Sequence, residues 1–224
     1  MRLLGAGRRR NGEITMSDSY VINEKRELIL ERVKEFIYQN GGVVKWSSLK
    51  ELDIDYRRIL DFVEKGDLIR LKNGYYCVRL SDFSEDELIA KLFPDCVLTL
   101  ESALDAYGYL ERKPYGYRLA VDKNTSKSRF HLDYPQVLPL YTEAETLELG
   151  VTEIPFGGGT MKIYEKERLV CDCLKYEDKM EREVLREGVF AFIKDPKKDV
   201  AKLMEYARER RVVKKVQMMI GVWL

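Results

Sequence analysis

The chain has 224 residues, of which 45% are hydrophobic and 34% charged, and its formal net charge is +1. This composition is ordinary for a folded protein and excludes a collagen-like or wholly disordered chain. The small net charge excludes a polycation that coats nucleic acid by bulk attraction, so any such contact must come from locally clustered cations. No stretch approaches the ~20 consecutive apolar residues of a membrane helix, and no early apolar run is long enough for a signal sequence. We therefore expect a cytoplasmic protein that does not contact a membrane.

The first 22 residues are expected to form a disordered extension. Met16 is an alternative start of the native protein. Three arginines, Arg8, Arg9 and Arg10, precede it. We interpret them as part of an unstructured segment, and the alternative is an arm that enters a DNA minor groove.

Residues 23–80 have the pattern of three short helices followed by a hairpin. Apolar residues at three- and four-residue steps predict a first helix over 25–39, capped by Asn23. Shorter helices are predicted around 47–52 and from Asp55 to Lys65. Residues 68–78 alternate like a hairpin whose Asn73-Gly74 turn suits a type I′ geometry. This order is typical of a winged helix-turn-helix domain, which binds DNA.

The helical spacing predicts which side chains of these helices face the core. In the first helix we expect burial of Leu28, Ile29, Val33, Phe36 and Ile37. In the third helix we expect burial of Tyr56, Ile59, Leu60 and Val63.

Two adjacent arginines, Arg57 and Arg58, are left outside in the first turn of the third helix, where a recognition helix approaches base edges. Arginine pairs bidentately with guanine or binds phosphate. Asp61 and Glu64 dilute this charge, so an ordinary amphipathic helix with a mixed surface is the alternative.

We predict base contacts from the first turn of the third helix and phosphate contacts from the segments that flank it. Near the hairpin tip, Arg70 and Lys72 are expected to face the phosphate backbone. A hairpin that only completes the core through Ile69, Leu71 and Tyr76 is the alternative. The predicted DNA-contacting residues are Lys45, Ser47, Tyr56, Arg57, Arg58, Arg70, Lys72 and Asn73.

Residues 81–224 are predicted to form a second, mixed α/β domain with a small sheet and C-terminal helices, so that the whole chain is α+β. Ser84 and Glu87 form a capping box that opens a helix ending at 92. Further helices are predicted over 98–107, 167–175, 181–193 and from 200 to the C-terminus. Strands are predicted over 117–121, 137–141, 150–154 and 160–164. Gly157-Gly158-Gly159 predicts a hairpin turn and not a phosphate-binding loop, because no Lys-Ser/Thr follows it.

No motif for metal binding or catalysis stands out, and we expect no cofactor, no metal and no enzymatic activity. The cysteines lack Cys-x-x-Cys spacing and are expected to be buried small hydrophobes: Cys77, Cys96, Cys171 and Cys173. Asp95 followed by Glu111-Arg112-Lys113 loosely matches a metal-dependent nuclease, but a predicted helix and loop separate the two carboxylates. His131 has no nucleophile motif around it.

Three sequence segments, taken together and in their order along the chain, form a more specific pattern than any one of them alone. Asp53-Ile54-Asp55 leads to a run from Gly66 to Tyr76 that ends in Gly-Tyr-Tyr. Glu101-Ser102-Ala103-Leu104 continues to Tyr107-Gly108-Tyr109. Ile163-Tyr164 is followed by Glu167-Arg168 and Asp172. Together they resemble the AbiEi family, the antitoxin and transcriptional-repressor half of type IV toxin–antitoxin (abortive-infection) systems.

The resemblance implies a repressor that binds double-stranded DNA at inverted repeats in its own promoter. It also implies phage defence by abortive infection, in which residues 81–224 counter a nucleotidyltransferase-type toxin without a stable complex. Asp53 stands where the family often has glycine, and aspartate tolerates the left-handed backbone that such a turn needs. A winged-helix protein-interaction module without operator binding is the alternative.

The last predicted helix carries five basic residues: Arg208, Arg210, Arg211, Lys214 and Lys215. We interpret them as the solvated flank of an amphipathic helix. The alternative is a second electropositive patch that touches DNA or an RNA-bound target of the toxin.

Overall fold

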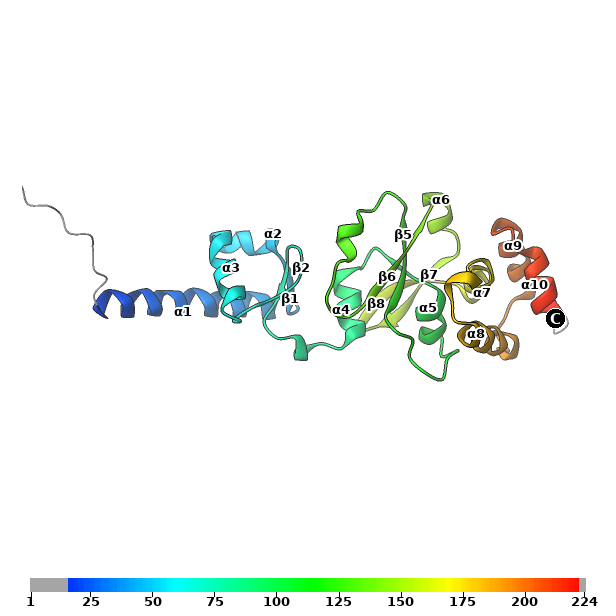
Figure 1. Ribbon diagram of the computed structural model, residues 1–224, viewed down its shortest axis with the longest axis horizontal. Coiled ribbons are helices and arrows are strands. Elements are labelled where there is room, and N and C mark those ends of the chain that lie inside the picture. Colours follow the sequence, from blue (N-terminus) through cyan, green and yellow to red (C-terminus); the bar gives the residue numbers. More distant parts are fainter. Residues whose placement is uncertain (1–15, 222–224) are drawn as a thin grey trace, which may run out of the picture. The chain divides into compact units, whose positions relative to one another are not determined.

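The computed structural model describes residues 16–221 of the chain (Figure 1). These residues divide into two compact units. The first comprises the chain up to Arg70 together with Gly74–Arg79, and the second comprises Leu71–Asn73 and the chain from Leu80 onward. Both units combine helices with a small sheet, so the predicted mixture of α and β structure is confirmed. None of the described helices combines the length and apolar character that crossing a bilayer requires.

The first unit has six helices and strands in chain order, joined by short connections. They are α1 (Met16–Gln39), β1 (Val43–Lys45), α2 (Trp46–Leu49), α3 (Tyr56–Glu64), β2 (Ile69–Lys72) and β3 (Tyr75–Cys77). A 3-10 turn, Lys50–Leu52, extends α2. The three strands form a sheet in the order β1-β3-β2, with β1 and β3 antiparallel. The three-residue strand β1 was not predicted, because it is too short to show an alternating pattern.

Helix α1 is longer than predicted. It begins at Met16, so Asn23 lies inside the helix and the prediction that Asn23 caps it is wrong. No glycine or proline interrupts residues 16–24, so nothing in this segment stops the helix. The predicted disordered extension of residues 1–22 therefore overlaps the helix, while its arginines Arg8, Arg9 and Arg10 lie outside the described residues.

The core of the first unit lies between α1, α3 and the sheet. Its fully buried side chains include Val33 and Ile37 of α1 and Ile59 of α3, as predicted. Two predictions of burial are wrong: Leu28 is 67% exposed and Leu60 is 37% exposed. The buried stripes are rotated toward Leu30 and Phe62. Burying the large Phe62 ring removes more apolar area from water than burying Leu60.

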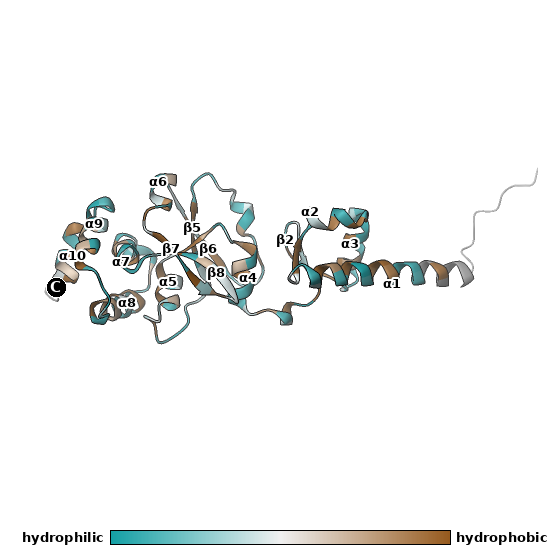
Figure 2. Ribbon diagram, turned by 180° about the vertical axis from the view of Figure 1, so that it is seen from behind, coloured by the Kyte–Doolittle hydropathy of each residue, from teal (hydrophilic) through white to brown (hydrophobic). Residues whose placement is uncertain are grey.

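Tyr56 is also more exposed than predicted, since 36% of its surface is accessible. The other predicted core residues, Ile29, Phe36 and Val63, are partly buried against the same core. Figure 2 shows the resulting alternation of hydrophobic and hydrophilic residues along α1.

The turns that flank α3 are set by local chemistry. Asp53 has φ 55°, so it adopts the left-handed backbone that was predicted for it. Asp55, where the third helix was predicted to begin, is the N-cap of α3, because its carboxylate accepts a hydrogen bond from the Arg57 backbone N–H. The hairpin turns at Asn73-Gly74, but only Gly74 has a positive φ, 77°. The prediction of a type I′ turn is therefore wrong, since that turn needs positive φ at both residues.

The second unit is built on a five-stranded sheet with the order β6-β5-β4-β8-β7. The strands are β4 (Val97–Leu98), β5 (Tyr117–Asp122), β6 (Val137–Thr142), β7 (Val151–Phe156) and β8 (Gly159–Tyr164). The four predicted strands are present, and the central two-residue strand β4 was missed. β4 pairs antiparallel with β5 and parallel with β8, so this short segment joins the two halves of the sheet.

The helices of the second unit are α4 (Glu85–Leu92), α5 (Leu100–Ala106), α6 (Ala144–Leu147), α7 (Lys166–Lys175), α8 (Arg182–Lys194), α9 (Val200–Glu209) and α10 (Val213–Met219). They follow the predicted pattern except that α6 was not predicted, α5 begins two residues later than predicted, and the C-terminal helix is divided. Short 3-10 turns occupy Leu80–Asp82, Lys127–Phe130 and Glu177–Lys179. The predicted last helix is in fact two helices, because Arg211 has φ 59° and breaks the chain between α9 and α10.

The three glycines between β7 and β8 form a hairpin turn, as predicted. Gly157 and Gly158 have φ values of 54° and 76°, and Phe156 pairs with Gly159 across the turn. A Cβ at Gly157 would lie 2.5 Å from the backbone of Asp86, at the start of α4. Glycine is therefore required here by close packing and by backbone conformation.

Helix α7 is buried along most of its length and carries an ionic network in the core of the second unit. Asp172 pairs with Arg168 at 2.9 Å and with Arg210 at 2.5 Å, and all three side chains are at most 4% exposed. The Arg168 guanidinium also donates to the carbonyl oxygens of Leu149 and Thr146 and lies 4.2 Å from the centre of the Tyr164 ring. One carboxylate thus holds two buried cations from α7 and from the end of α9.

Replacing Asp172 with Asn is expected to destabilise the protein by about 3–5 kcal/mol, because two buried guanidinium groups lose their counter-charge. Urea unfolding followed by circular dichroism measures this loss. Glu209→Gln, at an exposed position on α9, is the matched control and should change the free energy of unfolding by less than about 0.5 kcal/mol. Equal small effects of both variants would contradict the role given to Asp172.

Candidate nucleic-acid interface

The first turn of α3 presents two cations to solvent. Arg57 and Arg58 are exposed, and their backbone N–H groups donate to the carboxylate and the carbonyl oxygen of Asp55 at 2.9 and 3.0 Å. Within residues 16–221, neither guanidinium has a hydrogen-bond or ion-pair partner. The cap fixes the backbone of this turn, while both charged groups stay available to a ligand.

An aromatic cluster supports the same turn. The rings of Trp46 and Tyr56 meet edge-to-face with centroids 4.8 Å apart. The hydroxyl of Tyr76 donates to that of Tyr56 at 3.4 Å, and burial is the main cause that raises the pKa of Tyr76 to about 12. Tyr56 is therefore held from two sides beside Arg57, with part of its ring on the surface.

The hairpin is tied to the start of α2 by the backbone. The Trp46 N–H donates to the carbonyl oxygen of Gly74 at 2.8 Å, which fixes the turn beside α2. Lys45 lies opposite Tyr75 in the β1–β3 ladder, with its ammonium 5.5 Å from the centre of the Tyr75 ring. The remaining predicted contacts on these segments are exposed: Ser47, Arg70 and Asn73.

The prediction that Lys72 contacts phosphate is wrong. Its side chain is only 7% exposed, and Leu71–Asn73 cluster with the second unit. The Lys72 ammonium donates to the carbonyl oxygen of Leu92 at 3.0 Å and lies 3.9 Å from the centre of the Phe93 ring. These contacts desolvate the ammonium and replace its water, so Lys72 has a structural role.

Arg26 of α1 is a residue that sequence reasoning missed. Its guanidinium donates to the carboxylate of Asp61 at 3.1 Å and to that of Asp67, and lies 5.0 Å from the centre of the Phe62 ring. Lys65 also pairs with Asp61, at 3.0 Å. Asp61, one of the two acids that dilute the positive charge of α3, is thus neutralised by Arg26 and Lys65. No local pattern signals this contact, since Arg26 lies 35 residues before Asp61.

The basic patch predicted on the C-terminal helix is smaller in the structure, because two of its five residues have protein partners. Arg210 is buried with Asp172, and Lys215 donates to the carbonyl oxygen of Leu174 at 2.8 Å and pairs with Glu177 at 2.9 Å. The inclusion of Arg210 in a surface patch is therefore wrong. Exposed members of the set are Arg208, Arg211 and Lys214.

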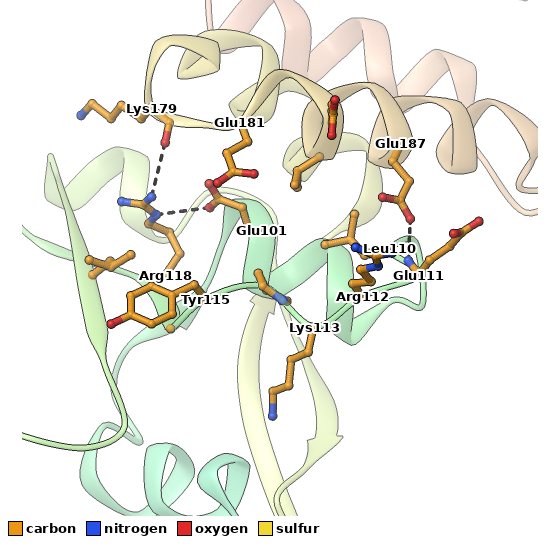
Figure 3. Close-up of a pocket in the computed structure, with 15 residues that line it drawn as sticks. Glu101, Leu110, Glu111, Arg112, Lys113, Tyr115, Arg118, Lys179, Glu181 and Glu187 are labelled. Carbon is orange, nitrogen blue, oxygen red and sulfur yellow. Dashed lines mark hydrogen bonds and ion pairs between the residues drawn. The ribbon is translucent and has the colours of Figure 1, made fainter.

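The second unit contains a cavity of about 680 Å³ between the loop 110–116 and the start of α8 (Figure 3). Glu101 pairs with Arg118 at 3.3 Å on its wall, and Arg118 also donates to the carbonyl oxygen of Lys179. Glu187 of α8 accepts the backbone N–H of Glu111. Glu101, Arg118 and Glu187 are thus engaged by protein partners at the wall of this cavity.

The residues of the nuclease pattern have other partners. Asp95 binds Arg129 through two hydrogen bonds, one of them 2.7 Å long, whereas Glu111 lies at the cavity beside Glu187. His131 is exposed. In the described part of the chain, no three His, Cys, Asp or Glu side chains are grouped so that they could hold a metal ion. The four cysteines are buried, as predicted.

No model of a known protein family matches the chain, and no curated protein matches it. Support for a function therefore comes from the geometry of the first unit and from the resemblance of the three sequence segments.

Replacing Arg26 with Ala is expected to lower the free energy of unfolding of the first unit by about 1–2 kcal/mol, because partly buried charged hydrogen bonds to Asp61 and Asp67 are lost. Fluorescence of Trp46 in a Trp223→Phe background reports on this unit during urea unfolding. Lys34→Ala, which removes an exposed pair with Glu31 on the same helix, is the control and should have almost no effect.

The same variant should respond less to acid. The pKa of Asp61 is lowered below its usual 3.8, first by the hydrogen bond from Lys65 and then by that from Arg26. A lowered pKa gives stability that is present above the unfolded-state value and lost as the pH falls through the folded-state value. Removing Arg26 should therefore reduce the loss of stability below about pH 4. An identical acid response in both proteins would contradict the pairing.

Proposed function

We propose that this protein is a sequence-specific DNA-binding repressor whose first unit is a winged helix-turn-helix. The observation that carries the proposal is the pair of exposed guanidinium groups of Arg57 and Arg58, which have no partner among the described residues, on a capped first turn of α3. Arginine in this position can pair bidentately with guanine in the major groove.

The order of elements supports this proposal. α2 and α3 are joined by a short turn, and β2 and β3 form a hairpin that follows α3 directly. The order α1-β1-α2-α3-β2-β3 with the sheet order β1-β3-β2 supports the proposal of a winged domain, in which α3 would be the recognition helix and the hairpin the wing.

The surface around α3 supports a division of roles. Tyr56, Arg57 and Arg58 would meet base edges, since they share the first turn. The residues of the flanking segments would meet the phosphate backbone and fix the register on the duplex: Lys45, Ser47, Arg70 and Asn73. Because only local clusters are basic, affinity would depend on these few contacts and not on net charge.

We further propose that the protein is an antitoxin of the AbiEi type that represses its own promoter and counters a nucleotidyltransferase-type toxin. This step is supported by the order of the three resembling segments. Their residues in the second unit are mostly part of its framework: Ser102 accepts the Arg118 N–H at 2.7 Å, and Asp172 is buried with Arg168. The antitoxin role is therefore assigned to the second unit as a whole and not to one site.

Replacing Arg57 with Ala should cost about 1–3 kcal/mol of discrimination between the operator and unrelated DNA, because a bidentate base contact is lost. Fluorescence anisotropy with a duplex from the chain's own upstream region and with a scrambled duplex measures this difference. Lys50→Ala, an exposed change on the 3-10 turn after α2, is the matched control.

Equal loss of affinity for both duplexes with Arg57→Ala would contradict the base contact. A wild-type chain that binds neither duplex would favour the alternative, in which α3 contacts another protein. Co-expression with a nucleotidyltransferase-like protein encoded beside it tests the antitoxin role separately: rescue of growth supports that role, and its absence contradicts it.

A further inference from the structure

A hollow of about 500 Å³ lies between α1 and α3, inside the first unit. All seven residues that line it are charged, and they come from α3 with its two caps and from α1. The residues are Lys25, Arg26, Asp55, Arg57, Arg58, Asp61 and Lys65. The hollow therefore joins the candidate base-reading turn of α3 to α1, a helix for which the sequence predicted no DNA contact.

Both carboxylates of the hollow are already engaged. Asp55 accepts the Arg57 backbone N–H, and Asp61 is bound by Arg26 and Lys65. The Arg26 guanidinium donates to Asp67 as well as to Asp61, so its charge is already balanced within the protein. Two of the cations thus have their counter-charges within the protein.

Three cations of the hollow have no such partner. Within residues 16–221, the side chains of Lys25, Arg57 and Arg58 make no hydrogen bond or ion pair, and all three residues are exposed. Like charges around one hollow repel each other, and an anion placed among them relieves that repulsion. The hollow has the charge and the open geometry of an anion-binding site, and both of its carboxylates already accept hydrogen bonds from the protein.

We propose that this hollow binds the phosphate backbone of the same duplex that α3 reads, and that Lys25 is the phosphate contact contributed by α1. The inference rests on the proposed DNA-binding function and adds a contact outside the helix-turn-helix and the wing. Lysine binds phosphate as a point charge, so this contact carries no sequence information.

A phosphate contact leaves a defined signature in binding data. Each neutralised phosphate contributes about 0.9 to the slope of log K against log salt concentration on duplex DNA. Loss of Lys25 should therefore lower affinity for every sequence by the same factor and reduce that slope by about one contact.

The test compares the full-length wild-type chain with Lys25→Ala, Lys25→Arg and Lys34→Ala. Affinities for the upstream duplex and for a scrambled duplex are measured by fluorescence anisotropy between about 50 and 200 mM salt. Lys25→Ala should bind both duplexes about three- to tenfold more weakly at the lowest salt and lose about 0.9 of the slope. Lys25→Arg should keep the wild-type affinity and slope, because it keeps the charge.

Lys34→Ala removes a cation from the same helix outside the hollow and should leave binding unchanged. An equal effect of Lys34→Ala and Lys25→Ala would overturn the proposal, since it would show diffuse attraction. A loss of affinity with Lys25→Ala that is confined to the upstream duplex would also overturn the proposal. Unchanged affinity of Lys25→Ala for both duplexes, while the wild type binds, would overturn it too. In both cases the proposed DNA-binding function would stand. A wild-type chain that binds neither duplex overturns the proposed function itself.

Discussion

The orientation of α3 is the constraint on which the account depends. Ile59 and Phe62 are fully buried against α1 and the sheet, and their burial decides which side of the helix meets solvent. Arg26 reinforces that orientation because it lies against Phe62 and binds Asp61. The buried apolar face of α3 and the ionic contact of Arg26 therefore act together to keep Arg57 and Arg58 on the surface. Their exposure follows from packing, and without that packing the same charges would have no fixed geometry.

Local sequence patterns predicted the parts of the fold that local chemistry decides. The Ser84 cap, the left-handed Asp53 and the glycine turn between β7 and β8 are found as expected, because each depends on a few neighbouring residues. The strands β1 and β4 were missed because segments of three and two residues carry no readable period. Their existence depends on partners that lie far away in the sequence.

The candidate site was predicted only in part, for a similar reason. Arg57 and Arg58 stay on the surface because they lie opposite the buried stripe of their own helix. Lys72 and Arg210 look equally exposed in the sequence, yet tertiary contacts with Leu92 and Asp172 bury them. The period of a helix or strand predicts on which face a side chain lies, whereas the burial of a long lysine or arginine side chain depends on what packs against that face. The Arg26 contact was hidden because its acids are 35 and 41 residues away.

Hydrogen–deuterium exchange of the full-length chain, with and without a duplex from its own upstream region, tests the central claim most directly. The account predicts slower exchange of backbone amides in the first turn of α3 and around the Asn73-Gly74 turn when the duplex is present. It predicts no change in the loop 110–116, which lines the cavity of the second unit. Unchanged exchange at α3 in the presence of saturating duplex, or slowing confined to the second unit, would contradict it.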